Sequence, residues 1–191
     1  ILKDQEFEMT LKNKISNKDI ENTVTEGSIG TIFYPVDDDV SKAKIKSLIS
    51  ISNKTKTPVL FSKSTYPYKA IGILVNNDFG ESTSNSIAFD LASSLSASLV
   101  AVNITQPKFL QSEDTAKLTD SLEKMQDLAL SYQVQLDFEN HEGNEAKIFS
   151  ELSSQFDLSI IGNGKNQSWQ SRKTTEFISN NSKSSVLYIP S

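Results

Sequence analysis

The chain has 191 residues, a net charge of −5 and a pI near 5.0, which argue against nonspecific binding to nucleic acids or anionic membranes because both need a basic surface. It has no cysteine, so disulfides and thiolate metal sites are excluded, and its single histidine, His141, disfavours a zinc site or a Ser-His-Asp triad. No apolar run approaches the roughly 18 residues of a membrane-spanning helix, so no direct insertion of this segment into a membrane is expected.

The first third of the chain alternates short apolar runs with segments of helical periodicity. Strands are predicted over residues 7–11, 31–36 and 59–61, and helices over residues 19–25 and 40–52. Proline and tyrosines around residue 67 then predict a linker over residues 65–68.

A complete set of alternating elements follows the linker. Strands are predicted over residues 71–76, 99–104, 134–138, 158–161 and 186–189, and helices over residues 82–95, 112–133, 145–156 and 174–181. This βαβαβαβαβ order is typical of a doubly wound parallel sheet, so the predicted fold class is α/β.

The chain also repeats part of itself. Residues 51–61 and 178–188 are identical at six of eleven positions, and 127 residues separate the two segments. The same offset places the predicted strand at 31–34 on 158–161, and Asn17 on Asn144. The first copy matches only the last three strands of the second. We therefore expect an incomplete repeat over residues 1–64, the linker, and a complete domain over residues 69–191.

Five segments of the complete copy resemble, in order and spacing, segments of the UspA-like universal stress protein family. They are Ile73–Asn76 ending the first strand, Ile87–Ala92 in the first helix, Glu142–Asn144 followed by Ile148 before the third helix, Ile160–Lys165 after the fourth strand, and Val186–Pro190 in the last strand. The chain is similar to the tandem form of this family, with an incomplete first repeat. The resemblance implies an adenine nucleotide alpha hydrolase-like fold with strand order 3-2-1-4-5 and a non-catalytic regulatory role.

ATP-binding members of the family share Gly-x-x-Gly, nine residues and Gly-Ser/Thr after the fourth strand, where backbone amides approach the phosphates. Here Gly162 matches, but Lys165 stands at the second glycine, and the residues near the expected Gly-Ser are basic. Asn76 stands where the family has an aspartate for the adenine and ribose, and its amide can still donate and accept. The resemblance thus implies a degenerate nucleotide site made of Asn76, Asn77, Gly162, Asn163, Gly164, Lys165, Arg172, Lys173 and Thr174. No cofactor is required by the sequence, and ATP or AMP is the ligand that this site implies.

Two further features leave alternatives open. Asp37-Asp38-Asp39 follow a strand of the first copy, where they form either an acidic helix start or a magnesium site. Trp169 falls in a predicted polar loop, residues 166–171, and either packs over that loop or anchors a partner or a base.

In the family, two copies pair antiparallel through their last strands. Val59-Leu60-Phe61 and Val186-Leu187-Tyr188 are both such strands, so we expect this interface inside one chain. In the order 3-2-1-4-5 the first strand of the incomplete copy, residues 7–11, is not a neighbour of its second, residues 31–36. Either it moves beside that strand, or it pairs with another molecule, or the missing part was cut away. An open sheet edge beside residues 31–36 favours a homodimer.

Two functional classes follow from these observations. The first is a cytoplasmic stress-response or regulatory protein that senses a nucleotide. The alternative is the cytoplasmic regulatory C-terminal domain of a cation/proton antiporter or permease, with the transporter as a partner in cis. The start at Ile1, without methionine and inside a repeat, favours a piece of a longer protein, and the Lys/Asn/Ser/Ile-rich composition favours a bacterial source. An enzyme is not expected, because the sequence offers no paired carboxylates, nucleophile–base pair or intact phosphate loop.

Overall fold

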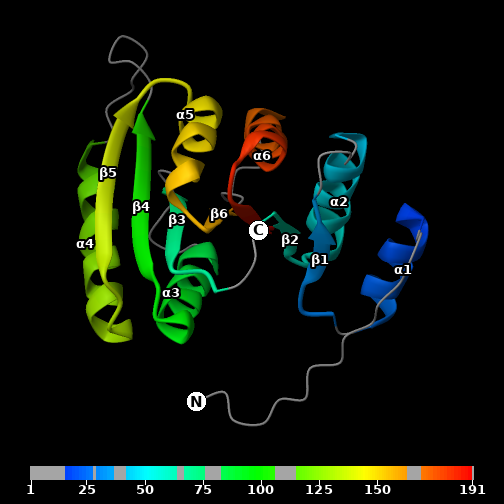
Figure 1. Ribbon diagram of the computed structural model, residues 1–191, viewed down its shortest axis with the longest axis horizontal. Coiled ribbons are helices and arrows are strands. Elements are labelled where there is room, and N and C mark those ends of the chain that lie inside the picture. Colours follow the sequence, from blue (N-terminus) through cyan, green and yellow to red (C-terminus); the bar gives the residue numbers. More distant parts are fainter. Residues whose placement is uncertain are drawn as a thin grey trace.

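The computed structural model describes residues 16–27, 29–36, 42–63, 67–75, 83–105, 115–162 and 169–190 (Figure 1). Its elements are α1 (Asn17–Glu26), β1 (Ile32–Pro35), α2 (Lys42–Thr55), β2 (Val59–Ser62), β3 (Ala70–Val75), α3 (Thr83–Leu95), β4 (Ser98–Thr105), α4 (Thr115–Tyr132), β5 (Leu136–Glu142), α5 (Glu145–Leu152), a 3₁₀ turn (Ser153–Gln155), β6 (Leu158–Gly162), α6 (Trp169–Asn181) and β7 (Ser185–Ile189). The predicted strand at residues 7–11 and the carboxylates at 37–39 lie outside the described residues.

The described strands form one mixed sheet in the order β1-β2-β7-β6-β3-β4-β5. All neighbours are parallel except β2 and β7, which are antiparallel. Counted within the complete copy, β5-β4-β3-β6-β7 is the strand order 3-2-1-4-5, so the predicted doubly wound topology is confirmed. The two predicted units share this single sheet.

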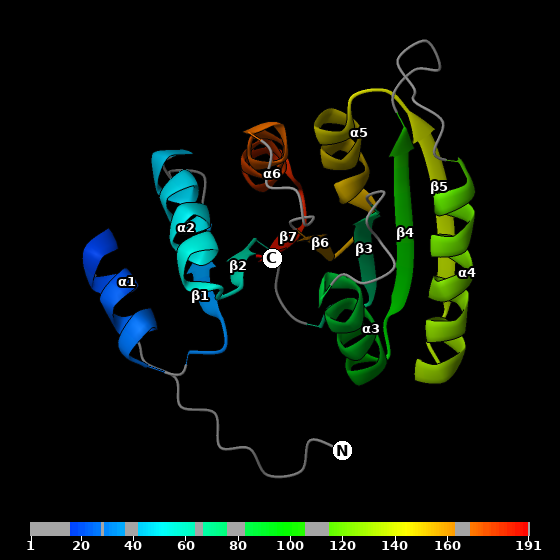
Figure 2. The ribbon, with the colours of Figure 1, turned by 180° about the vertical axis from the view of Figure 1, so that it is seen from behind.

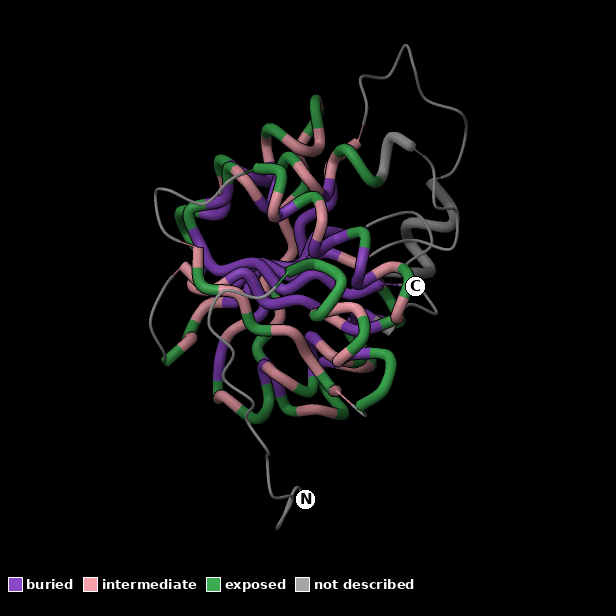
Figure 3. The backbone as a smooth tube through the Cα atoms, turned by 90° about the vertical axis from the view of Figure 1, so that its right-hand side faces the viewer, coloured by how far each residue is buried: buried purple, intermediate pink, exposed green. Residues whose placement is uncertain are grey.

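Two apolar layers cover the faces of the sheet. On one face the buried side chains of α3 and α4, among them Phe89 and Met125, pack on β3, β4 and β6. On the other face α2, α5 and α6 contribute Leu48, Phe149 and Ile178. The strands in the middle are therefore buried from both sides, as expected for parallel strands between helices (Figure 3).

The strand registers confirm the repeat at residue level. In the half repeat, Ile32 pairs with Val59 and Tyr34 pairs with Phe61. The pairs of β6 with β7 are Ser159–Val186 and Ile161–Tyr188, each 127 residues further along the chain. The offset read from the sequence is therefore the offset of the backbone hydrogen-bond ladder.

The β2–β7 ladder is centred on Leu60 and Leu187, which face each other and are themselves equivalent positions of the repeat. On either side, Val59 pairs with Tyr188, and Phe61 pairs with Val186. These pairs exchange under a two-fold rotation, so an approximate two-fold axis passes between the two leucines. The half repeat and the last third of the complete copy are thus related as two subunits of a symmetric dimer would be.

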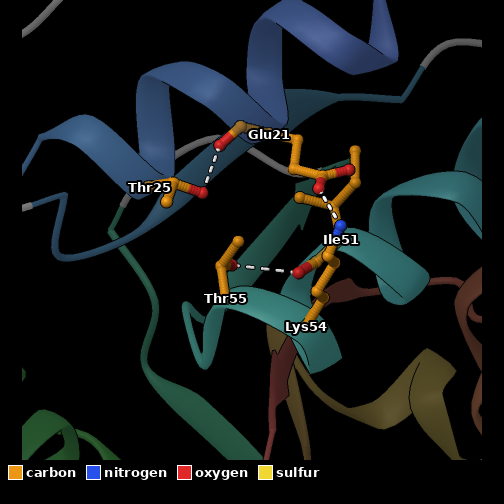
Figure 4. Close-up of polar contacts among 5 residues, drawn as sticks. All are labelled: Glu21, Thr25, Ile51, Lys54 and Thr55. Carbon is orange, nitrogen blue, oxygen red and sulfur yellow. Dashed lines mark hydrogen bonds and ion pairs between the residues drawn. The ribbon is translucent and has the colours of Figure 1, made fainter.

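Helix α1 is attached mainly to α2, and polar contacts carry much of this attachment. Ser16 caps α1, with Asp19 completing the capping box. Lys54 forms an ion pair with Glu21 across the two helices (Figure 4). At the other end Asn17 donates through Nδ2 to Ser47 Oγ at 2.7 Å. Among the described side chains of α1, Val24 alone is buried.

The segment that leaves β2 is held to the complete copy by hydrogen bonds. Lys63 donates from its backbone to Ser185 Oγ at 3.0 Å, and Tyr68 donates its hydroxyl to the same oxygen at 3.1 Å. The Lys63 ammonium also donates to the carbonyl oxygens of Ser179 and Ser182, at 3.2 and 2.8 Å. This cation therefore caps the carbonyl end of α6.

Candidate functional site

The candidate site lies where the complete copy changes winding direction. β3 and β6 are hydrogen-bonded neighbours, yet the chain leaves β3 for the α3 face and β6 for the α6 face. In open α/β sheets such a switch point leaves a crevice outside the carboxyl ends of the two strands, and ligands bind there. In this chain β3 ends at Val75, β6 ends at Gly162, and the first turn of α3 approaches Gly162.

Gly162 has a packing reason to be glycine. A Cβ built on it would lie 2.3 Å from Ser84 Oγ and 2.7 Å from Ser84 Cβ. Ser84 stands in the first turn of α3 and is only 8% exposed, so it cannot give way cheaply. The family resemblance explains this glycine by the approach of a phosphate. The structure adds that it lets the first turn of α3 close onto the end of β6.

The basic residues of the predicted site lie deeper in a helix than the sequence indicates. α6 begins at Trp169, five residues before the predicted start, so Trp169 is not in a loop. Arg172, Lys173 and Thr174 fall after the first three helical positions, whose amides alone lack partners inside a helix. Their backbone amides are therefore engaged in the helix, and only their side chains are available to a ligand. Arg172 and Lys173 are exposed, and Thr174 is half-buried.

The charge of Arg172 also affects Tyr188, a residue of the β2–β7 interface. Burial raises the pKa of the Tyr188 phenol to about 12, against the weaker opposing effect of the charge on Arg172. Tyr188 donates its hydroxyl to Asn53 Oδ1 at 2.7 Å, which links β7 to α2. The Arg172 charge thus lies within electrostatic reach of the α2–α6 contact.

The remaining predicted ligand residues, Asn76, Asn77, Asn163, Gly164 and Lys165, lie outside the described residues. They directly follow β3 and β6 in the sequence, so the two strands that the structure places side by side are the ones that lead into them. Their role as a site stays a prediction.

The sequence did not predict an amide pair that lies at the same edge of the sheet. Asn103 near the end of β4 is 6% exposed and donates through Nδ2 to Asn140 Oδ1 on β5 at 3.0 Å. Asn103 is also paired with Val75, the last residue of β3, which places it one strand from the switch point. An asparagine inside the apolar run Val100–Ile104 was the available signal, because buried amides need partners.

One further side-chain pair at this edge joins two residues of β5. His141 on β5 lies 2.9 Å from Glu139 Oε2, and both side chains are about one third exposed. Within the described ranges, no group of three or more His, Cys, Asp or Glu side chains is arranged to hold a metal ion. No helix of the described part of the chain is long and apolar enough to span a bilayer.

Comparison with solved structures identifies the fold. A protein of unknown function from Pseudomonas aeruginosa PAO1 matches with a TM-score of 0.60, and a putative universal stress protein from Pseudomonas aeruginosa UCBPP-PA14 with 0.62. Each has 17% identity over 94% of this chain and 69% of its own length. A universal stress protein solved in complex with cAMP matches 65% of this chain and 98% of its own, with 17% identity and a TM-score of 0.53.

The chain therefore has the fold of the universal stress proteins, and the resemblance seen in the sequence is confirmed at the level of the fold. By sequence, no known family profile and no curated protein matches it.

Proposed function

We propose that the protein is a regulatory protein of the universal stress type that binds an adenine nucleotide, without turnover, at the carboxyl ends of β3 and β6. The observation that carries this proposal is the β3–β6 switch point, with Gly162 at its rim and the predicted ligand residues directly after both strands. A similar structure was solved in complex with cAMP, which supports an adenine nucleotide as the class of ligand.

The missing second glycine and the helical position of Arg172–Thr174 shape the expected binding mode. The backbone amides of Arg172–Thr174 are engaged in α6, so their side chains, two of them cations, must supply the contacts to a phosphate. We therefore propose a monophosphate or cyclic nucleotide ahead of ATP, since a triphosphate needs more donors. A cytoplasmic location follows from this role. The transporter-domain alternative stays a prediction that no observation on the described residues favours.

A thermal-shift titration of the full chain tests the proposal, with AMP, cAMP, ADP and ATP, each with and without magnesium. A ligand at 100 times its dissociation constant stabilises the native state by about 2.7 kcal/mol. Lys165→Ala and Lys173→Ala should weaken the effect. Lys46→Ala is the matched control, because Lys46 is the exposed equivalent of Lys173 in the half repeat. Equal shifts in all three variants, or no shift with any nucleotide, would reject the site.

A further inference from the structure

The amide pair of Asn103 and Asn140 lies in one row with the two strand ends of the proposed site. Asn103 is paired with Val75, the last residue of β3, and on its other side with Asn140 of β5. The register of β3 with β6, continued to the ends of both strands, sets Val75 level with Gly162. The four residues therefore follow one another across β6, β3, β4 and β5, and β4 and β5 lie side by side at one end of the sheet (Figures 1 and 2).

The row also faces one side of the sheet. Val75 belongs to the core layer under α3 and α4, and so do Ala101 and Phe138, each two residues before a member of the amide pair. Because side chains alternate along a strand, both amides lie on this α3 side. Gly162 faces the same way, since a Cβ there would meet the first turn of α3. Three strand spacings, about 14 Å, separate β6 from β5. A mononucleotide whose phosphate lies at the end of β6 would therefore reach the amide pair with its base.

The hydrogen bond within the pair fixes the orientation of the Asn140 amide. Asn103 is 6% exposed and donates through Nδ2 to Asn140 Oδ1 at 3.0 Å, whereas Asn140 is exposed. An amide oxygen has two lone pairs, so Asn140 Oδ1 can accept a second hydrogen bond, and its Nδ2 carries two donors. Turning this amide over would set its N–H group against the N–H group of Asn103 and lose the bond. Asn140 therefore offers an acceptor beside a donor in a fixed order.

An acceptor beside a donor is the complement of one edge of adenine. Adenine presents the N6 amino donor next to the N7 acceptor, and an asparagine side chain binds the two together. A purine with an oxygen at C6 has an acceptor in place of the amino group, so this oxygen would face Asn140 Oδ1, a second acceptor. We propose that Asn140 reads the base of a bound purine nucleotide, and that Asn103 is the positioning residue that makes the reading selective for adenine. This inference rests on the proposed function, because it places the phosphate of the same ligand at the end of β6.

Calorimetric titration of the full chain with AMP and with IMP, which has an oxygen at C6, tests the inference. The wild type should bind AMP about tenfold more tightly, because a two-bond amide contact discriminates between bases by about this factor or more. Asn140→Ala should bring the ratio of the two dissociation constants close to one. Asn103→Leu should lower the ratio as well, with little loss of AMP affinity, because the Asn140 amide can then turn to suit either base.

The ratio is the readout because a purely structural defect would weaken both nucleotides alike. Gln135→Ala is the matched control, since Gln135 is an exposed amide directly before β5, at the opposite edge of the sheet. Its ratio should stay at the wild-type value. The urea midpoint of each variant shows that it is folded.

Equal affinity of the wild type for AMP and IMP would overturn the inference, and so would a preference for AMP that Asn140→Ala leaves intact. A preference lost in Asn140→Ala but kept in Asn103→Leu would overturn the positioning role of Asn103. If the chain binds neither nucleotide, the proposed function fails together with the inference. Binding of both with equal affinity overturns the inference alone, so the two failures are distinguishable.

Discussion

The half repeat and the last third of the complete copy contain the same elements with the same strand registers, but they differ in how many faces are covered. In the complete copy, β6 lies between β3 and β7 and between helices on both faces. In the half repeat, β1 has the β2 neighbour and the α2 face, while Phe33 remains in solvent. The same local sequence pattern therefore forms a core strand in one place and an edge strand in another, depending on what the rest of the chain packs against it.

A carboxylate placed in turn at the two equivalent positions, 33 and 160, should have very different effects on stability. Ile160→Asp should lose about 4 kcal/mol or more of unfolding free energy, because an unpaired charge is forced into the core. Phe33→Asp should change it by no more than about 0.5 kcal/mol. Urea denaturation of both variants measures the difference. Similar losses would mean that Phe33 is covered in solution by the chain itself.

The two leucines at the centre of the β2–β7 ladder test whether the internal interface is symmetric in energy as well as in geometry. Leu60 and Leu187 are 9% and 7% exposed and face each other. Each change to alanine should cost about 2–5 kcal/mol, and the two losses should agree within about 1 kcal/mol. A much smaller loss for Leu60→Ala, together with a lower urea m-value, would show that the half repeat detaches before the complete copy unfolds.

Tyr188 and Phe61 occupy equivalent positions of the repeat, and Tyr188 differs by its hydroxyl group. Because burial raises the phenol pKa to about 12 in the folded chain, against about 10 when unfolded, the unfolded state loses its proton first. Stability contributed by Tyr188 is therefore complete below pH 10 and is lost, by about 2–3 kcal/mol, between pH 10 and 12.

Tyr188→Phe should remove this alkaline loss and cost about 1 kcal/mol at neutral pH, where the bond to Asn53 disappears. Urea midpoints from pH 8 to 12 compare the two proteins. An unchanged alkaline profile in Tyr188→Phe would assign the loss to other groups.

Lys63 has no counterpart side chain in the repeat, since Pro190 occupies the equivalent position. Lys63→Ala should cost about 1 kcal/mol at pH 7, because two carbonyls of α6 lose their cationic donor. Burial, and secondarily the charge of Lys183, lower the pKa of Lys63 in the folded chain.

The unfolded chain therefore holds the Lys63 proton more tightly, and wild-type stability rises with pH toward 10.5. This rise should be absent in Lys63→Ala and present in Lys183→Ala, which removes an exposed lysine nearby. Identical pH profiles in the wild type and Lys63→Ala would contradict the assignment.

Much of the fold could be predicted from the spacing of apolar residues along the chain and from the internal repeat. The order of strands and helices along the chain followed from these signals. The strand order within the sheet and the pairing of residues 59–61 with 186–188 were implied by the family resemblance, and the structure confirms them. The site could be predicted only in part. Trp169 was placed in a loop because the segment around it is polar, whereas α6 already begins there. Polar residues carry no apolar periodicity, so the first turn of α6 was not visible in the sequence.

The sequence alone determined the class of fold and the 127-residue offset, because these depend on the order of short apolar segments along the chain. The strands that meet at the internal two-fold axis were implied by the family resemblance. Three facts come only from the tertiary structure. Gly162 has no room for a Cβ because Ser84 packs against it, Asn103 donates a hydrogen bond to Asn140, and Phe33 is exposed. These facts depend on contacts between segments far apart in the sequence. A residue's own type and neighbours record its preference for burial, but the packing of other elements decides whether it is buried.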